Sequence, residues 1–156
     1  MLQEGDYILG YMLNAGFSEE VKSWHEAHPE VPLRFFWDKK DAEDVTVIDD
    51  TLSFYKLNDK EFIRQMAGCK AYAATGGFES ICEAMYMGKP LLMVPSHIEQ
   101  RCNAWDATKF DAAVSADTFD LSVLLDFAEH KFKPDTAFPA WATSAPDLIV
   151  HELENL

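Results

Sequence analysis

The sequence predicts a Rossmann-like three-layer α/β/α domain with a mostly parallel sheet. Short apolar runs, typical of strands buried on both faces, alternate along the chain with segments of helical period. The stretch 70–104 contains a strand, a glycine turn, a helix, a glycine stop and a second strand, the order of a βαβ unit. The chain has 156 residues, of which 48% are hydrophobic, so it can form one domain with a substantial core.

The first half of the chain is expected to contribute the beginning of this sheet and two helices. Ser18 starts the first helix, with glutamates in its first turn, and Asp59 is expected to cap the second. A charged loop, 39–44, is expected to face solvent. The expected strands are 6–13, 33–37, 45–48 and 52–57, and the expected helices are 18–27 and 60–67.

The second half continues the alternation. Gly88 ends a helix as its C-terminal cap, Pro90 prevents its continuation, and Pro95 stops the strand that follows. The segment 131–146 contains three prolines and is expected to be loose, with Trp141 anchoring it on the sheet. The expected strands are 70–74, 91–94 and an edge strand 112–114. The expected helices are 79–87, 121–130 and 147–154, together with a helix that includes Asn103 and ends at about residue 110.

The turn Thr75-Gly76-Gly77 has a chemical consequence, because ligands collect at the carboxyl ends of parallel strands. Free amides at the start of the next helix, those of residues 78–80, would point toward an anion there. The hydroxyls of Thr75 and Ser80 could add hydrogen bonds, and Glu83, about a turn further on, could accept bonds from sugar hydroxyls. From these residues alone, a plain strand-to-helix turn and a solvated glutamate remain an alternative.

The whole stretch carries a more specific signal than its glycines. It resembles the donor-binding signature of GT-B glycosyltransferases, most closely the C-terminal half of UDP-sugar enzymes such as the lipid II-forming N-acetylglucosaminyltransferase family. The match is close over 70–104, and the order of elements agrees from about 6 to 130. The matching residues are Gly76-Gly77, Ser80, Glu83-Ala84, Gly88-Lys89-Pro90, Pro95, Glu99-Gln100 and Asn103-Ala104.

The resemblance assigns roles to individual residues. It implies that Thr75, Gly76, Gly77, Phe78, Glu79 and Ser80 hold the donor diphosphate, that Glu83 binds the ribose, and that Glu99, Gln100 and Asn103 contact the donor sugar. Thr75 departs from the family, in which many members carry histidine or asparagine. Leu57 and Asn58 are candidates for the base side, and Asn14, Gly16 and His97 lie in loops expected at the same sheet edge.

The resemblance also implies an activity. The chain, 1–156, looks like the nucleotide-sugar-binding half of an inverting glycosyltransferase without a cofactor or metal, inactive alone, with the catalytic base and acceptor site on an N-terminal domain or subunit. Three alternatives remain open. They are a nucleotide-sugar epimerase or hydrolase of the same fold, a non-catalytic nucleotide-binding or partner subunit, and a doubly wound domain whose glycine turn is purely structural.

Charge and composition exclude other classes. A net charge of −14 argues against binding to nucleic acid or an anionic membrane surface. No apolar stretch approaches a membrane span, and residues 1–4 lack the features of a signal peptide, so a cytoplasmic protein is expected. Within 70–104 the acids Glu79, Glu83 and Glu99 are matched by Lys70, Lys89 and Arg101, so the pocket is not expected to be acidic.

The remaining reactive residue types show no further site. Cys69, Cys82 and Cys102 are expected to be reduced thiols, with Cys82 in the core. Surface positions are expected for His25, His28, His130 and His151. No metal-ligand spacing or Ser-His-Asp arrangement is present, and the glycine turn lacks the lysine of a P-loop, which argues against ATP hydrolysis.

Overall fold

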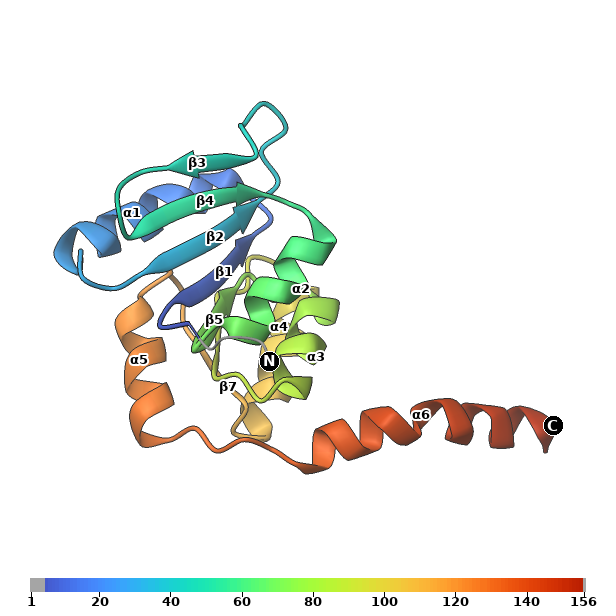
Figure 1. Ribbon diagram of the computed structural model, residues 1–156. Helices are drawn as coiled ribbons and strands as arrows, with labels where there is room; N and C mark the ends of the chain where they lie inside the picture. Colours follow the sequence, from blue (N-terminus) through green and yellow to red (C-terminus); the bar gives the residue numbers. More distant parts are fainter. Residues whose placement is uncertain (1–4, 156) are drawn as a thin grey trace.

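The computed structural model describes residues 5–155 and has the predicted three-layer α/β/α architecture, with one seven-stranded sheet (Figure 1). The strand order is β3-β4-β2-β1-β5-β6-β7, and every neighbouring pair is parallel except β3 and β4. The prediction that the chain lacks a signal peptide rests on residues 1–4, which lie outside the described part. The strands are β1 Ile8–Met12, β2 Leu33–Trp37, β3 Val45–Val47, β4 Leu52–Lys56, β5 Ala71–Ala74, β6 Leu91–Met93 and β7 Ala113–Ser115.

Helices cover both faces of the sheet. On one face α2, α3 and α4 contribute Met66, Ile81 and Ala104 to one core. On the other face α1 and α5 contribute Val21 and Leu124 to a second core. The helices are α1 Ser18–Ala27, α2 Asp59–Gly68, α3 Phe78–Tyr86, α4 Ile98–Lys109, α5 Leu121–His130 and α6 Ala137–Glu154, preceded by a short 3₁₀ turn, η1 Ala15–Phe17.

The central strands are buried on both sides, which explains their continuous apolar sequences. In β5, Ala71 and Ala73 face the α1–α5 side, whereas Tyr72 and Ala74 face α2–α4, because successive side chains of a strand point to opposite faces. The edge strand β3 is exposed on both of its valines and forms an antiparallel hairpin with β4. Burial explains the sequences of the central strands, whereas β3 was predicted as a β-branched run and its antiparallel pairing was not predicted.

Two helix ends show how local sequence sets the boundaries. The Oδ1 atom of Asn58 accepts a hydrogen bond from the amide of Glu61 at 3.0 Å, so Asn58 caps α2, and the expected cap, Asp59, is the first helical residue. Gly88 has a φ of +63°, and the amide of Lys89 donates to the carbonyl of Ala84 at 2.9 Å, which closes α3 as predicted.

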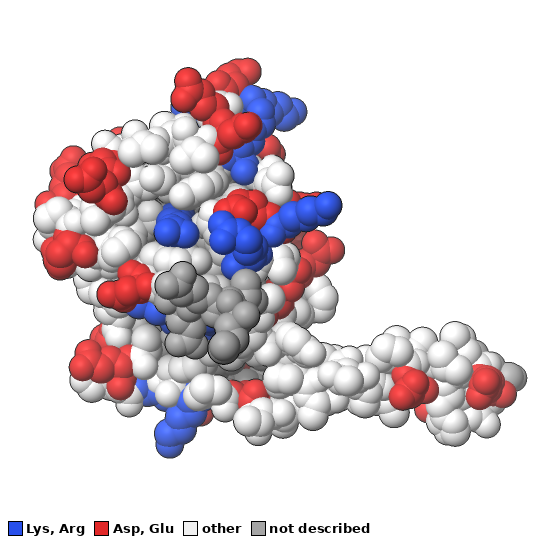
Figure 2. All heavy atoms as spheres, viewed as in Figure 1, with Lys and Arg blue, Asp and Glu red and all other residues white. Residues whose placement is uncertain are grey.

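The C-terminal segment differs from the prediction. Residues 137–154 form one continuous helix, α6, which begins inside the segment expected to be loose. Pro139 lies in its first turn, where a missing amide removes no helical hydrogen bond, and Pro146 is tolerated inside it. Trp141 is 60% exposed on α6 and does not anchor the segment on the sheet. The helix leaves the body of the domain, and its surface is largely uncharged (Figures 1 and 2).

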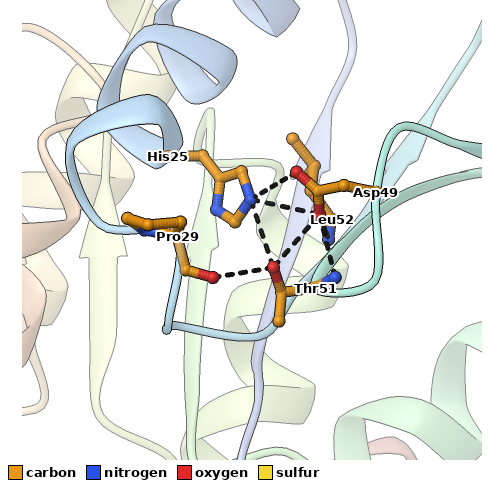
Figure 3. Close-up of polar contacts among 5 residues, drawn as sticks. All are labelled: His25, Pro29, Asp49, Thr51 and Leu52. Carbon is orange, nitrogen blue, oxygen red and sulfur yellow. Dashed lines mark hydrogen bonds and ion pairs between the residues drawn. The ribbon is translucent and has the colours of Figure 1, made fainter.

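His25 is the histidine for which the surface prediction is wrong. It lies on the inward stripe of α1 and is 3% exposed. Its Nε2 atom is 3.0 Å from Oδ2 of Asp49, whose other oxygen accepts hydrogen bonds from the amides of Thr51 and Leu52, each at 2.8 Å (Figure 3). The backbone hydrogen bond from Thr51 is the largest of the effects that lower the pKa of Asp49 to about 2; others come from Leu52 and His25. This cluster ties α1 to the turn before β4.

The cysteines are free thiols, as predicted. Burial raises the pKa of Cys69 to about 11, so this thiol is an inert core group. Cys82 is only half-buried, at the wall of a cleft, and not in the core as expected. Within residues 5–155, no helix has both the length and the apolar composition needed to cross a bilayer.

Candidate functional site

A cleft of about 960 Å³ opens at the carboxyl edge of the sheet, where β1 and β5 end. Its walls come from the end of β1, the start of α2, the first turns of α3 and the start of α4. Ligand sites are common at this edge of open α/β sheets. Of the residues predicted to bind a donor, the cleft is lined by Leu57, Thr75, Gly77, Phe78, Glu79, Ser80, Glu83, Glu99 and Gln100.

The glycine turn brings the amino end of α3 to this cleft. Gly76 has a φ of +101°, a conformation that side chains strongly disfavour, and a Cβ atom there would lie 3.2 Å from Cε of Met93. Gly77 is the N-cap of α3, and no side chain caps the helix. A Cβ atom at Gly77 would meet nothing within 4 Å. The first amides of α3 therefore face an open approach at the positive end of the helix dipole.

Thr75 adds a polar group to the same wall. It is 1% exposed and lines the cleft, and its Oγ1 atom has no hydrogen-bond partner within the described residues. Buried hydroxyls are usually paired, because leaving one unpaired costs about 1–3 kcal/mol. An unpaired hydroxyl beside the bare amino end of a helix indicates a position where a ligand oxygen can bind.

Glu83 lies on α3, about one turn beyond Ser80, and lines the cleft. Partial burial raises the pKa of its carboxyl group, and the nearby charges of Glu79 and Asp59 raise it further. The carboxylate is therefore held in an unfavourable environment that hydroxyl donors from a ligand would improve.

Gln100 is only partly available. It is 4% exposed, and its Oε1 atom accepts hydrogen bonds from the amide and the hydroxyl of Ser96, at 2.8 and 2.9 Å. These bonds hold the β6–α4 loop and orient the side-chain amide so that Nε2 is the group left to donate. Glu99, its neighbour, is exposed at the mouth of the cleft.

Asn103, predicted at the sugar, and His97, predicted in a loop at the same sheet edge, lie outside the cleft wall. The Nδ2 atom of Asn103 donates to the carbonyl of Gly76 at 3.0 Å, so this side chain holds the glycine turn from behind. His97 is the N-cap residue of α4 and is exposed. Neither lines the cleft, although Asn103 acts directly on the turn that does.

Two of the loop segments predicted at this edge, 14–16 and 57–58, make hydrogen bonds within their own turns. Asn14 accepts a hydrogen bond from the amide of Gly16 at 2.8 Å, which makes both part of the η1 turn and leaves both outside the cleft lining. Asn58 is engaged as the cap of α2. Leu57 is 44% exposed and does line the cleft.

The sequence reasoning missed part of the wall. Tyr11 and Leu13 line the cleft from the end of β1, and Asp59, Phe62 and Ile63 line it from α2. We expected the loop after β1 to reach the ligand edge and therefore chose residues 14 and 16. The residues of this segment that line the cleft come slightly earlier in the chain. The alternation of β1 could have indicated Tyr11, because it lies on the same face of the strand as Leu9, toward α2–α4.

A family model described as glycosyl transferase family 1 matches residues 2–130. The chain belongs to this family. A search of curated protein sequences finds no match.

Solved glycosyltransferase structures share the fold of this family 1 chain. The spinosyn forosaminyltransferase SpnP matches 98% of the chain with a TM-score of 0.65 and 14% identity. SnogD from Streptomyces nogalater matches 82% at 0.59 and 14%, and the spinosyn rhamnosyltransferase SpnG complexed with thymidine diphosphate matches 96% at 0.58 and 14%. The match covers only 44%, 35% and 43% of those chains, so this chain spans less than half of their length. The fold is therefore one half of GT-B.

The charge of the cleft in this family 1 domain differs from the prediction. Asp59, Glu79, Glu83 and Glu99 line it, and the described lining contains no Lys, Arg or His. The cations expected to balance them lie elsewhere: Lys70 pairs with Asp6 and Lys89 donates to the carbonyls of Ala67 and Cys69. Both lysines precede parallel strands and therefore sit at the amino edge of the sheet, whereas Arg101 is exposed outside the cleft lining. The interpretation that the pocket is not acidic is wrong.

A second, apolar groove of about 410 Å³ adjoins the cleft in the glycosyltransferase domain. It lies between α3, α4 and the start of α6, and Phe78 and Cys82 line both hollows. Trp141 lines this groove, and its ring lies tilted against the ring of Phe138, with ring centroids 5.7 Å apart. The sequence did not reveal the groove, because it depends on the path of α6.

Proposed function

We propose that this chain is the donor-binding half of an inverting glycosyltransferase that uses a nucleotide sugar, with UDP as the nucleotide. The observation that carries the proposal is the uncapped amino end of α3 behind Gly76, open to a large cleft and flanked by the unpaired hydroxyl of Thr75. Backbone amides at a helix start are a common means of binding phosphate groups.

The donor diphosphate binds across the glycine turn, with the amides of Phe78, Glu79 and Ser80 donating to its oxygens. An acceptor hydroxyl, deprotonated by a base on the N-terminal domain or subunit, attacks the anomeric carbon from the side opposite the diphosphate. The new carbon–oxygen bond forms while the bond from the anomeric carbon to the phosphate oxygen breaks, and the proton goes to the base. The departing UDP carries the negative charge, which the α3 amides stabilise without a metal ion.

The ribose is recognised by Glu83, whose carboxylate accepts hydrogen bonds from the two ribose hydroxyls. Its raised pKa supports this role, because a partly desolvated carboxylate gains most from two donors. The similar structure of SpnG was solved with thymidine diphosphate, which lacks the 2′-hydroxyl. A preference for UDP over thymidine diphosphate is therefore the specific expectation for this chain.

The donor sugar lies toward the start of α4. The Nε2 atom of Gln100 donates to one sugar hydroxyl, and the carboxylate of Glu99 accepts from another. Asn103 contributes indirectly, because its hydrogen bond to the carbonyl of Gly76 sets the backbone that meets the diphosphate. UDP-N-acetylglucosamine is the first donor to test, since the stretch 70–104 resembles the lipid II-forming family.

Catalysis requires a second half. The matched structures are more than twice as long as the region they share with this chain, and the base and the acceptor site are proposed to lie in such an additional domain or subunit. The chain alone is expected to bind nucleotide with micromolar to millimolar affinity, because binding energy from the other half is lacking. It is expected to transfer little sugar.

Titration of ¹⁵N-labelled protein with UDP tests the proposal. Saturable shifts of the amides of residues 76–83 are expected, and they should weaken in Glu83→Gln but not in Glu152→Gln, a matched exposed glutamate on α6. No saturable shift in residues 76–83 with UDP, UDP-sugars or thymidine diphosphate would leave a purely structural glycine turn. Robust sugar transfer by the isolated chain would contradict the assignment of the base to another half.

A further inference from the structure

The cleft that we propose for a diphosphate has the same sign of charge as its ligand. Four of the side chains that line it are the carboxylates of Asp59, Glu79, Glu83 and Glu99, and its described lining includes no cationic side chain. A nucleoside diphosphate brings several more negative charges. The amino end of α3 offsets this only partly, because a helix terminus is equivalent to roughly half an elementary charge.

The carboxylates lie close enough to affect one another. The pKa of Glu83 is raised by burial and then by the charges of Glu79 and Asp59. The carboxylates of Asp59, Glu79 and Glu83 therefore repel one another even before an anionic ligand arrives.

Three basic side chains of the neighbouring elements are engaged away from the cleft. Lys70 pairs with Asp6 at 2.6 Å, and Lys89 donates to two main-chain carbonyls at 2.9 and 2.7 Å, both at the amino edge. Arg64 pairs with Glu61 on the outer side of α2. The countercharge for a bound diphosphate has no source among the described residues of the cleft wall.

Exposed apolar side chains stand between these carboxylates. Leu13, Leu57 and Phe78 line the cleft and are 53%, 44% and 64% exposed. Large apolar side chains held in water around a cleft are typical of a surface that another protein face covers.

We propose that a separate domain or subunit closes this cleft with a face that carries Lys or Arg side chains among apolar ones. Its cations pair with Asp59, Glu79 and Glu99 and complete the diphosphate site. Nucleotide and partner then bind with positive cooperativity, since the cations of the partner offset the repulsion between the cleft and the diphosphate, and the bound diphosphate adds negative charge that attracts those cations. The inference rests on the proposed nucleotide site and adds the chemistry of the partner.

The dependence of UDP affinity on salt gives the first test. In the chain alone, UDP affinity should rise about threefold or more between about 0.01 M and 0.3 M NaCl, because salt screens a net repulsion. Asp59→Asn/Glu79→Gln should bind UDP about three- to tenfold more tightly at low salt and lose this dependence. The matched control, Glu26→Gln/Glu129→Gln on α1 and α5, removes the same charge from the other face of the sheet and should behave as wild type.

Two outcomes of this titration would overturn the inference. UDP affinity that falls as NaCl increases would mean that the chain supplies its own countercharge. A stronger gain from MgCl2 than from NaCl at matched ionic strength would assign the countercharge to a metal ion and not to a protein face.

A second measurement does not depend on nucleotide. A hexa-arginine peptide added to ¹⁵N-labelled protein should shift amides of residues 76–83 and 99–100 first, with weaker binding in Asp59→Asn/Glu79→Gln and unchanged binding in the α1–α5 control. Preferential binding at the acidic stretch 38–50, or uniform shifts over the surface, would refute a basic partner face here. If no variant binds UDP at either ionic strength, the nucleotide site fails, while the peptide map still decides the partner surface.

Discussion

Replacing Gly76 by alanine tests whether the conformation of the glycine turn creates the phosphate site. The φ of +101° is a region that costs a side-chain-bearing residue about 1–3 kcal/mol. The new Cβ atom would also lie 3.2 Å from Cε of Met93 and 3.3 Å from Cβ of Gln100. The methionine tip can move, but Gln100 is held by its bonds to Ser96. We therefore expect a loss of about 2–3 kcal/mol in the free energy of unfolding.

Gly88→Ala provides the matched control. Gly88 also has a positive φ, +63°, but its Cβ atom would meet only Pro134 at 3.6 Å, and it lies at the opposite end of α3 from the cleft. Alanine in this left-handed conformation should cost about 1 kcal/mol. Both variants therefore lose stability, and only Gly76→Ala changes the backbone that faces the ligand.

Urea unfolding and UDP titration of the two variants separate stability from binding. The midpoint of unfolding should fall in both, with an unchanged slope. UDP affinity should fall about tenfold or more in Gly76→Ala, equivalent to about 1.4 kcal/mol, and stay at the wild-type value in Gly88→Ala. Wild-type UDP affinity in a folded Gly76→Ala protein would refute the phosphate role, and wild-type stability would refute the backbone argument.

Three further variants test individual side chains. Thr75→Val should leave the free energy of unfolding unchanged or higher, since it removes an unpaired buried hydroxyl, and it should weaken UDP binding about fivefold. Unchanged UDP affinity in calorimetry would show that the hydroxyl does not contact the ligand. Glu83→Gln should raise the melting temperature at pH 7, because it removes a carboxylate whose pKa is raised, and this gain should disappear at low pH as the wild-type carboxyl group takes up its proton. The variant should also lose the preference for UDP over thymidine diphosphate. If that preference persisted, a contact between Glu83 and the ribose would be excluded. The pKa of Asp49 is lowered from its usual 3.8 to about 2, so the stability that this carboxylate contributes is complete above about pH 4 and is lost as the pH falls toward 2. Asp49→Asn should therefore lower the melting temperature at pH 7 and flatten the decline of the melting temperature between about pH 4 and 2. A decline as steep as in wild type would place the stabilising carboxylate elsewhere.

The order of elements was predictable because it depends on local patterns. Buried runs such as 71–74 and the stop at Gly88 are encoded by side chains close in sequence, and the structure confirms both. Of the nine predicted residues that line the cleft, six were found because ligands collect at the carboxyl ends of parallel strands, whereas Leu57, Glu99 and Gln100 came from the resemblance to GT-B glycosyltransferases. Asn103 was placed in the sugar site, and only the tertiary structure shows it holding Gly76 from behind.

The errors of the sequence reasoning share one cause. His25 was expected at the surface because its partner, Asp49, is 24 residues away and its burial depends on how α1 packs. Trp141 was expected on the sheet because prolines suggested a break, whereas α6 continues through them and carries the side chain away. Both depend on contacts or paths that no local pattern encodes.

The sequence by itself determined the sheet, the glycine turn and the family signature in 70–104, since these rest on backbone preferences and short-range spacing. Only the tertiary structure decided the charge of the cleft. Counting residues along the chain balanced Lys70 and Lys89 against the glutamates, but a residue before a parallel strand and one after it end up at opposite edges of the sheet. Electrostatic interactions depend on distance in space, and the fold separates those charges.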